Sequence, residues 1–129
     1  MRELIVVELL REGCEVREAA NGWDLLACID ALVYNADPPM VDLIIADVRM
    51  PGAGGMEALT ALQTASRRPP VILISAFGDA EMHTQANRLG AAAFFDKPFD
   101  LDLLRSAVRN LAMRRSAVSA EDEVYVFER

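Results

Sequence analysis

The segment over residues 41–52 (VDLIIADVRMPG) constrains the fold of this chain more than any other. Residues 43–46 form an uninterrupted apolar run, which is typical of a central parallel strand that is covered on both faces. Asp47 follows where such a strand ends, and Pro51-Gly52 marks a loop after it. Ligands of open α/β sheets bind at the carboxyl ends of the strands. Asp47 is therefore either a reactive carboxylate or a cap of the following turn.

The length and composition are those of one domain with an ordinary core: 129 residues, 53% apolar and 26% charged. No uncharged apolar run has membrane-spanning length and no signal-peptide pattern is present, so we expect a cytoplasmic protein without a membrane partner. A net charge of −7 argues against direct binding to nucleic acid. Cys14 and Cys28 lack metal-ligand spacing and are interpreted as reduced packing residues. We expect His83 to be a solvated residue on a helix surface.

The apolar periodicity divides the chain into alternating helices and strands. It predicts helices over residues 1–12, 23–34, 56–65, 80–89 and 101–114. It predicts strands over residues 14–19, 43–46, 71–74 and 91–95, and a further segment rich in β-formers at 123–128. This order predicts an α/β fold with a doubly wound parallel sheet.

Polar side chains follow three of the predicted strands. Asp47 and Ser75 end the second and third strands, and Lys97 comes just after the fourth. Parallel strands place these residues at one edge of the sheet, where they suit phosphoryl transfer. A carboxylate can attack phosphorus, an ammonium can neutralise phosphoryl oxygens, and a hydroxyl can donate to the new phosphoryl group.

The chain resembles the receiver domain of two-component response regulators. The matching segments are Asp47-Val48-Arg49-Met50-Pro51-Gly52, Gly54-Gly55-Met56-Glu57-Ala58-Leu59, Ile74-Ser75-Ala76-Phe77, Gly90-Ala91-Ala92 and Lys97-Pro98-Phe99. The resemblance covers about residues 1–113 and implies a flavodoxin-like receiver fold. It also implies a signalling module, not an enzyme.

The resemblance implies specific roles for the strand-end residues. Asp47 is the expected phosphoacceptor, Ser75 the switch hydroxyl and Lys97 the phosphate-binding lysine. Phe94 stands at the aromatic switch position, with core packing as the alternative, whereas core packing is favoured for Phe95. Asp47 and the backbone carbonyl of Arg49 are the expected Mg²⁺ ligands, and the Lys97-Pro98 peptide is expected to be cis, which proline permits.

The chain departs from the family at its start. Members of the family begin with an apolar strand that ends in two acids, and these acids bind Mg²⁺, whereas Met1 here matches the first helix. We therefore expect this strand and its acids to be absent and Mg²⁺ binding to be poor. In the strand order 2-1-3-4-5 the missing strand lies inside the sheet. Burial of four or five apolar side chains is worth on the order of 10 kcal/mol, so the vacancy must be filled or closed.

The C-terminal segment has the form of the missing strand. We divide the chain into a receiver-like domain over residues 1–115 and a linker plus strand over 116–129. Residues 124–128 form an apolar run that ends on Glu128, which would replace one acid of the pair. The strand can fill the vacancy in its own chain or in a strand-swapped homodimer. The alternatives are a loose tail, and direct pairing of residues 14–19 with residues 43–46.

These observations leave three functional hypotheses. The first is a receiver module phosphorylated on Asp47 by a histidine kinase or a phosphotransfer protein, impaired because its metal ligands are incomplete. The second is a degenerate receiver that works by dimerisation or docking without phosphorylation. The third is a small phosphohydrolase, which is disfavoured because no second acid is placed to assist Asp47.

Overall fold

The computed structural model describes residues 2–11, 15–19, 21–35, 41, 43–48, 54–65, 68–76, 80–115 and 123–127. The helices are α1 (Arg2–Arg11), α2 (Gly22–Ile29), α3 (Gly55–Ala61), α4 (Ala80–Arg88) and α5 (Leu101–Arg115), with a π-helical segment η1 (Asp30–Tyr34). The strands are β1 (Glu15–Glu18), β2 (Leu43–Asp47), β3 (Val71–Ser75), β4 (Ala93–Asp96) and β5 (Glu123–Phe127). The predicted alternation of helices and strands, and with it the α/β fold class, is confirmed.

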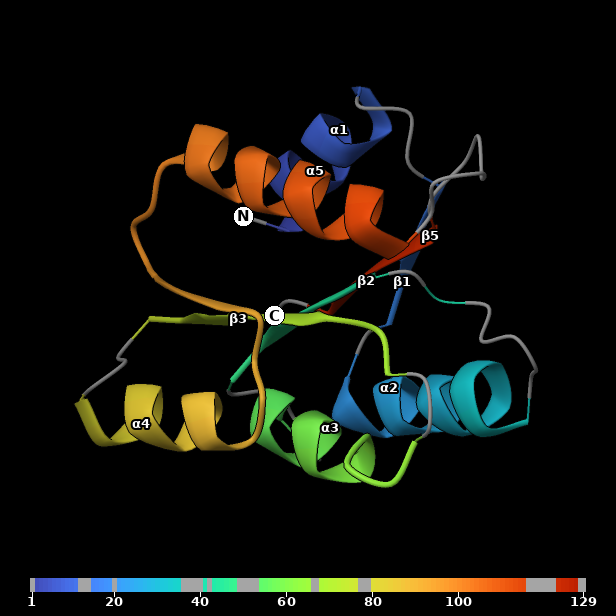
Figure 1. The fold of residues 1–129 in the computed structure, drawn as a ribbon. Coiled ribbons are helices and arrows are strands. Elements are labelled where there is room, and N and C mark those ends of the chain that lie inside the picture. Colours follow the sequence, from blue (N-terminus) through green and yellow to red (C-terminus); the bar gives the residue numbers. More distant parts are fainter. Residues whose placement is uncertain are drawn as a thin grey trace.

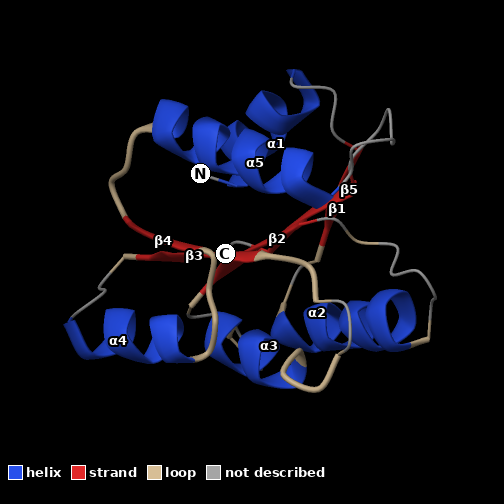
Figure 2. Ribbon diagram, viewed as in Figure 1, coloured by secondary structure: helices blue, strands red, loops and turns tan. Residues whose placement is uncertain are grey.

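The strands form one parallel sheet between two layers of helices. Helices α1 and α5 cover one face, and α2, α3 and α4 cover the other (Figure 1). Figure 2 shows the strands as a twisted layer between them. This is the doubly wound arrangement that the apolar runs predict, because a strand covered on both faces needs apolar side chains in both directions.

The side chains of the central strands alternate between two apolar clusters. Leu43 and Ile45 of β2 pack in a cluster with Ile5 and Leu9 of α1 and with residues of α5. Ile44 and Ala46 pack in the opposite cluster with residues of α2 and α3. All five residues of β2 and of β3 are buried. The buried centre of the sheet therefore ends on Asp47 and Ser75.

Strand β5 lies inside the sheet, in the order β1-β5-β2-β3-β4. It runs parallel to both neighbours, with Val126 opposite Glu18 of β1 and opposite Ile45 of β2. This is the place that the receiver order assigns to the first strand, and β5 fills it within its own chain. The alternative of direct pairing between residues 14–19 and 43–46 is wrong, because β5 separates the two strands. The loose tail is wrong for residues 123–127, whereas the strand-swapped form stays a prediction.

One predicted helix changes its character before it ends. The segment over residues 23–34 is α-helical only to Ile29, and Asp30–Tyr34 is π-helical. The helix begins at Asn21, whose side chain accepts a hydrogen bond from the Asp24 N–H at 2.9 Å. The Tyr34 hydroxyl donates to the Ala61 carbonyl at 2.5 Å, which ties this segment to α3.

Among the described residues, no helix has the length and apolar character needed to cross a membrane.

A proline in β5 tests the position of this strand. A strand between two others uses its N–H groups for pairing, so Val126→Pro removes a donor inside the sheet. We expect the free energy of unfolding to fall by roughly 3 kcal/mol or more. Far-UV circular dichroism in urea measures this loss. Val126→Ile, which keeps the N–H group, is the control, and equal midpoints for the two variants contradict the placement.

Candidate functional site

The register of the sheet brings three strand ends together. Asp47 of β2 is opposite Ile74 of β3, and Ser75 is opposite Asp96 of β4. The Lys97 N–H donates to the Ser75 carbonyl at 2.7 Å, so the residue after β4 is fixed to the end of β3. Asp47, Ser75 and Lys97 thus share the carboxyl edge of the sheet, as parallel strands require.

Asp47 and Lys97 are in direct contact. The Lys97 Nζ donates to the Asp47 Oδ2 at 3.1 Å, and the two side chains are 9% (Asp47) and 22% (Lys97) exposed. A buried carboxylate is costly unless a charge or hydrogen bonds balance it, and the ammonium provides this balance. The Lys97-Pro98 peptide is cis, as the resemblance implied. The contact holds a carboxylate oxygen, which can act as a nucleophile, beside an ammonium group at the carboxyl edge of the sheet.

Helix α4 contacts the same strand ends through two consecutive residues. The Ser75 hydroxyl, which is buried, donates to the Met82 Sδ at 3.9 Å. The His83 Nε2 lies 2.9 Å from the Asp96 Oδ2, and its ring lies 4.1 Å from the Phe94 ring centroid. His83 lies on the surface of α4 with its side chain 41% exposed, as expected, and it also contacts Asp96 and Phe94 of β4. Periodicity carries no signal of these contacts, since they join residues that are distant along the chain.

The two phenylalanines of β4 pack on opposite faces of the sheet. Phe94 is half-buried and packs against the cluster beneath α2, α3 and α4, where it also contacts His83. Phe95 packs against the cluster beneath α1 and α5, with its ring 5.6 Å from that of Phe99. Phe94 therefore packs against both this cluster and His83 of α4, and its switch role stays a prediction.

Two glycines let α3 begin directly against the end of β2. A Cβ at Gly54 would lie 1.9 Å from the Val48 carbonyl oxygen. A Cβ at Gly55 would lie 2.5 Å from a Leu73 methyl carbon and 3.1 Å from the Asp47 carbonyl oxygen. Neither backbone oxygen can move without disturbing β2. The Gly54 N–H donates to the Glu57 carboxylate at 2.8 Å, which fixes the start of the helix. The Gly-Gly pair thus determines the surroundings of Asp47.

The described residues do not by themselves make a magnesium site. Mg²⁺ requires several oxygen ligands in near-octahedral geometry. Within the described part of the chain, no group of three or more histidine, cysteine, aspartate or glutamate residues is placed to bind a metal ion. Of the expected ligands, Asp47 lies at the strand edge, whereas Arg49 and Glu128 lie outside the described residues.

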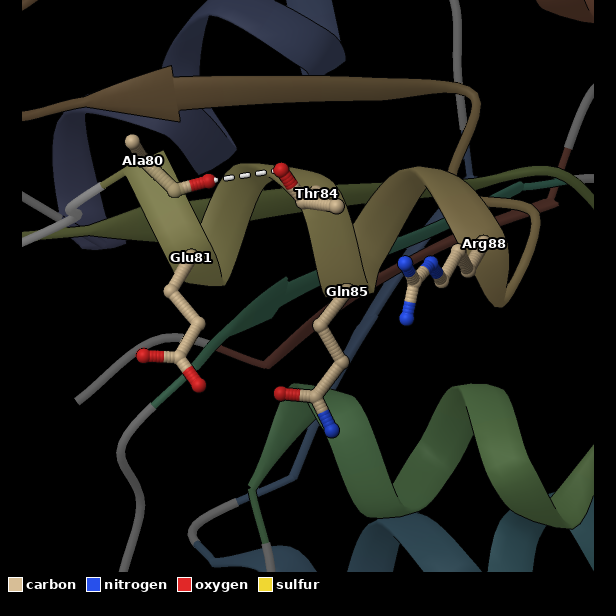
Figure 3. A pocket seen from close by; sticks show the side chains of 5 residues that line it. All are labelled: Ala80, Glu81, Thr84, Gln85 and Arg88. Atoms are coloured by element: carbon tan, nitrogen blue, oxygen red, sulfur yellow. Dashed lines mark hydrogen bonds between the residues drawn. The ribbon is translucent and has the colours of Figure 1, made fainter.

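Two hollows border α4, away from the Asp47–Lys97 contact. One, of about 490 Å³, lies between α4 and β4 and is lined by residues that include His83, Asn87 and Phe94. The other, of about 580 Å³, is lined by Ala80, Glu81, Thr84, Gln85 and Arg88, all on α4. Figure 3 shows Glu81, Gln85 and Arg88 pointing from α4 toward the side on which α3 lies. Neither hollow is lined by Asp47, Ser75 or Lys97.

Comparison with known proteins decides the family. The response regulator receiver domain matches residues 1–109. The chain belongs to this family. Phosphorylation by histidine kinases or phosphotransfer proteins and Mg²⁺ binding are typical of receiver domains. The fold is therefore that of a receiver domain of two-component response regulators.

Relatives of the receiver domain differ in size. The sporulation initiation phosphotransferase F of Bacillus subtilis is 34% identical over 99 residues, which are 77% of this chain and 74% of that protein. The regulatory protein AtoC of Escherichia coli is 37% identical over 116 residues, which are 90% of this chain and 24% of that protein. The chain thus spans most of the first relative but only about a quarter of the second.

Solved structures show the same fold. The receiver domain of the response regulator NarL from Mycobacterium tuberculosis is similar with a TM-score of 0.71 and 31% identity, covering 85% of each chain. The receiver domain of a LuxO repressor from Vibrio parahaemolyticus gives a TM-score of 0.75 at 23% identity, covering 89% of this chain and 83% of that one. The latter likeness concerns the fold.

The Asp47–Lys97 contact can be measured by a double-mutant cycle. Removal of the ammonium in Lys97→Met leaves the buried carboxylate without this partner, whereas the same change in the Asp47→Asn background costs less because no carboxylate is present. We expect a coupling free energy of about 1–3 kcal/mol from urea unfolding of wild type, Lys97→Met, Asp47→Asn and the double variant.

A second cycle on the Arg105–Glu8 pair is the control. Arg105 Nη1 lies 3.2 Å from Glu8 Oε2, but these side chains are more exposed, so its coupling should stay below about 1 kcal/mol. A coupling for Asp47–Lys97 no larger than this control would contradict its description as a buried pair.

Proposed function

We propose that this receiver domain accepts a phosphoryl group on Asp47. The observation that carries the proposal is the contact of 3.1 Å between Lys97 Nζ and Asp47 Oδ2 at the carboxyl edge of the sheet. Three neighbouring strand ends supply a carboxylate, a hydroxyl and an ammonium there, and these groups together suit the transfer of an anionic phosphoryl group.

Each residue has a separate part in the proposed transfer. An Asp47 carboxylate oxygen attacks phosphorus, the bond from phosphorus to the donor breaks, and the donor leaves with the electron pair. The product is an acyl phosphate on Asp47. Lys97 balances the added negative charge, and the Ser75 hydroxyl turns from Met82 to donate to a phosphoryl oxygen. Phe94, on the neighbouring strand β4, follows the movement of Ser75.

We propose that the transfer is impaired because the metal ligands are incomplete. Mg²⁺, where it binds, supplies neutralisation of phosphoryl oxygens. Of the two expected carboxylate ligands, Asp47 and Glu128, only Asp47 lies within the described residues, and a single carboxylate binds a hard dication weakly. We further propose that the Arg49 carbonyl and the Glu128 carboxylate contribute the remaining protein ligands. In this division, residues 1–115 carry the phosphoacceptor and residues 116–129 complete its surroundings.

The partners follow from the chemistry. The phosphoryl donor is a histidine kinase or a phosphotransfer protein, because phosphohistidine delivers a phosphoryl group to a carboxylate without a nucleotide. The likeness to a sporulation phosphotransferase, of which this chain spans 74%, supports a role in such a relay. We propose a cytoplasmic location, no direct contact with nucleic acid and no enzymatic turnover of a separate substrate.

Chemical phosphorylation tests the role of Asp47. With acetyl phosphate and Mg²⁺, we expect slow and incomplete addition of one phosphoryl group, seen by intact-protein mass spectrometry. Asp47→Asn should abolish the addition, whereas Asp102→Asn, at an exposed acid on α5, should leave it unchanged. Glu128→Gln should slow it further if this carboxylate is a ligand.

Two results would each contradict a different part of the proposal. Labelling that persists in Asp47→Asn would remove Asp47 as the phosphoacceptor. Rapid, complete and Asp47-dependent labelling would retain the phosphoacceptor and overturn the impairment.

A second candidate function is dimerisation without phosphorylation. Helix α1 exposes three apolar side chains at a spacing of three residues, namely Leu4, Val7 and Leu10, which are 45–55% exposed. Leu103 on the neighbouring helix α5 is also exposed. An apolar stripe of this kind on a helix is typical of a contact surface and favours a homodimer through the α1 and α5 layer.

Charged substitutions on α1 test this surface. Leu4→Glu together with Leu10→Glu should raise the dimer dissociation constant at least about tenfold, equivalent to about 1.4 kcal/mol. Sedimentation after refolding at a series of concentrations measures the constant. Trp23→Glu is the control, since Trp23 is 66% exposed but lies on α2 in the opposite layer. Equal effects of the two changes would exclude α1 as the dimer surface.

A further inference from the structure

One side chain of α4 reaches two residues of β4. The His83 Nε2 lies 2.9 Å from the Asp96 Oδ2, and the His83 ring centroid lies 4.1 Å from that of Phe94, with the ring planes tilted by 36°. Phe94 and Asp96 are two positions apart on β4, so their side chains leave the same face of the strand. A single imidazole therefore attaches α4 to β4 at two points.

Helix α4 packs more loosely on the sheet than its neighbours in the same layer. Of its nine residues only Ala86 is buried, whereas α2 and α3 bury three residues each. Met82 adds a partly buried side chain to the apolar cluster beneath the helix. A helix with few buried contacts is easy to displace. The contacts of His83 therefore have a large share in fixing the position of α4.

The contacts of His83 are weak enough to break in the folded protein. The side chain of His83 is 41% exposed and that of Asp96 is 49% exposed. Polar pairs and ring contacts at this exposure stabilise a protein only modestly. A hollow of about 490 Å³ between α4 and β4 borders both His83 and Phe94. The contact between these two rings can therefore open while the buried core of the sheet stays packed.

The residue before His83 contacts the hydroxyl at the end of β3. The Ser75 Oγ donates to the Met82 Sδ at 3.9 Å. Met82 and His83 thus link one helix to the end of β3 and to Phe94 on β4. In the proposed transfer, Ser75 turns from Met82 and Phe94 follows it. This movement separates Phe94 from His83 unless α4 moves as well.

We propose that His83 is a positioning residue that holds Phe94 and α4 in the arrangement of the unphosphorylated protein. Phosphorylation of Asp47 then proceeds against the contacts that His83 makes with Phe94 and Asp96. His83 acts through these two residues and is not a catalytic group. It regulates the site of the proposed function, on which this inference rests.

The direction of the effect follows from the two arrangements. A contact that exists in only one of them raises the population of that arrangement. Loss of the His83 contacts should therefore loosen α4 and at the same time favour the arrangement that accepts the phosphoryl group. A residue that merely supports the fold predicts the opposite, namely unchanged or slower phosphorylation when it is removed.

The rate of phosphorylation with acetyl phosphate and Mg²⁺ tests this direction. His83→Ala removes both contacts, and we expect it to take up the phosphoryl group about two- to tenfold faster than wild type in intact-protein mass spectrometry. Gln85→Ala, at an exposed residue of α4 that points toward the side on which α3 lies, is the control and should label at the wild-type rate (Figure 3). Equal or slower labelling of His83→Ala, or the same acceleration in Gln85→Ala, would overturn the proposal.

A conservative variant separates the two contacts of His83. His83→Phe keeps a ring against Phe94 without the polar contact to Asp96, so its labelling rate should return toward that of wild type. A His83→Phe rate equal to that of His83→Ala would contradict the part assigned to Phe94.

Hydrogen–deuterium exchange examines the attachment of α4 without phosphorylation. In the unphosphorylated full-length protein, the amides of residues 84–88 should exchange about two- to tenfold faster in His83→Ala than in wild type, with no such change in Gln85→Ala. Equal exchange in wild type and His83→Ala would contradict the attachment. A wild type that takes no label on Asp47 is a failure of the proposed function, and this exchange then decides the role of His83 by itself.

Discussion

The pairing of β5 with β1 and β2 is the interaction on which the remaining structure depends. Without it, β1 has no described partner in the sheet, and β2 loses the neighbour on one side. Unpaired backbone groups inside a covered sheet are costly, and helix α1, which lies against β5, would lose part of its contact with the sheet. The last described strand of the chain is thus a central element and not an appendage.

The strand-end site is a consequence of this sheet. Burial of β2 on both faces fixes the direction in which Asp47 leaves the strand, and the glycine start of α3 allows no side chain between helix and strand. Lys97 reaches the carboxylate because the residue after β4 is hydrogen-bonded to the end of β3. Helix α4 contacts the same strands through Met82, which accepts from Ser75, and through His83, whose ring lies against Phe94. A movement of Ser75 or Phe94 therefore alters a contact with this helix.

The sequence predicted the elements whose side chains follow a regular pattern. It did not predict features that depend on contacts between residues distant along the chain. Apolar runs predicted β2 and β3 because strands buried on both faces have a clear pattern. The polar residues after these strands predicted the location of the candidate site, since parallel strands end at one edge of the sheet. The π-helical end of the second helix was missed because its backbone hydrogen bonding has no counterpart in side-chain periodicity. The His83 contacts were missed because they join a helix to a strand edge. For β5, composition predicted a strand, but its location depended on which edges were vacant, and three alternatives stayed open.

Hydrogen–deuterium exchange of the backbone amides of β5 in the native protein tests the central claim most directly. Placement between β1 and β2 predicts that the amides of residues 123–127 exchange as slowly as those of residues 43–47 in β2, since both segments open only when the sheet separates. Protection of this kind arises whether β5 comes from the same chain or from a partner. Amides of residues 123–127 that exchange at the rate of an unpaired chain, beside a protected β2, would contradict the account.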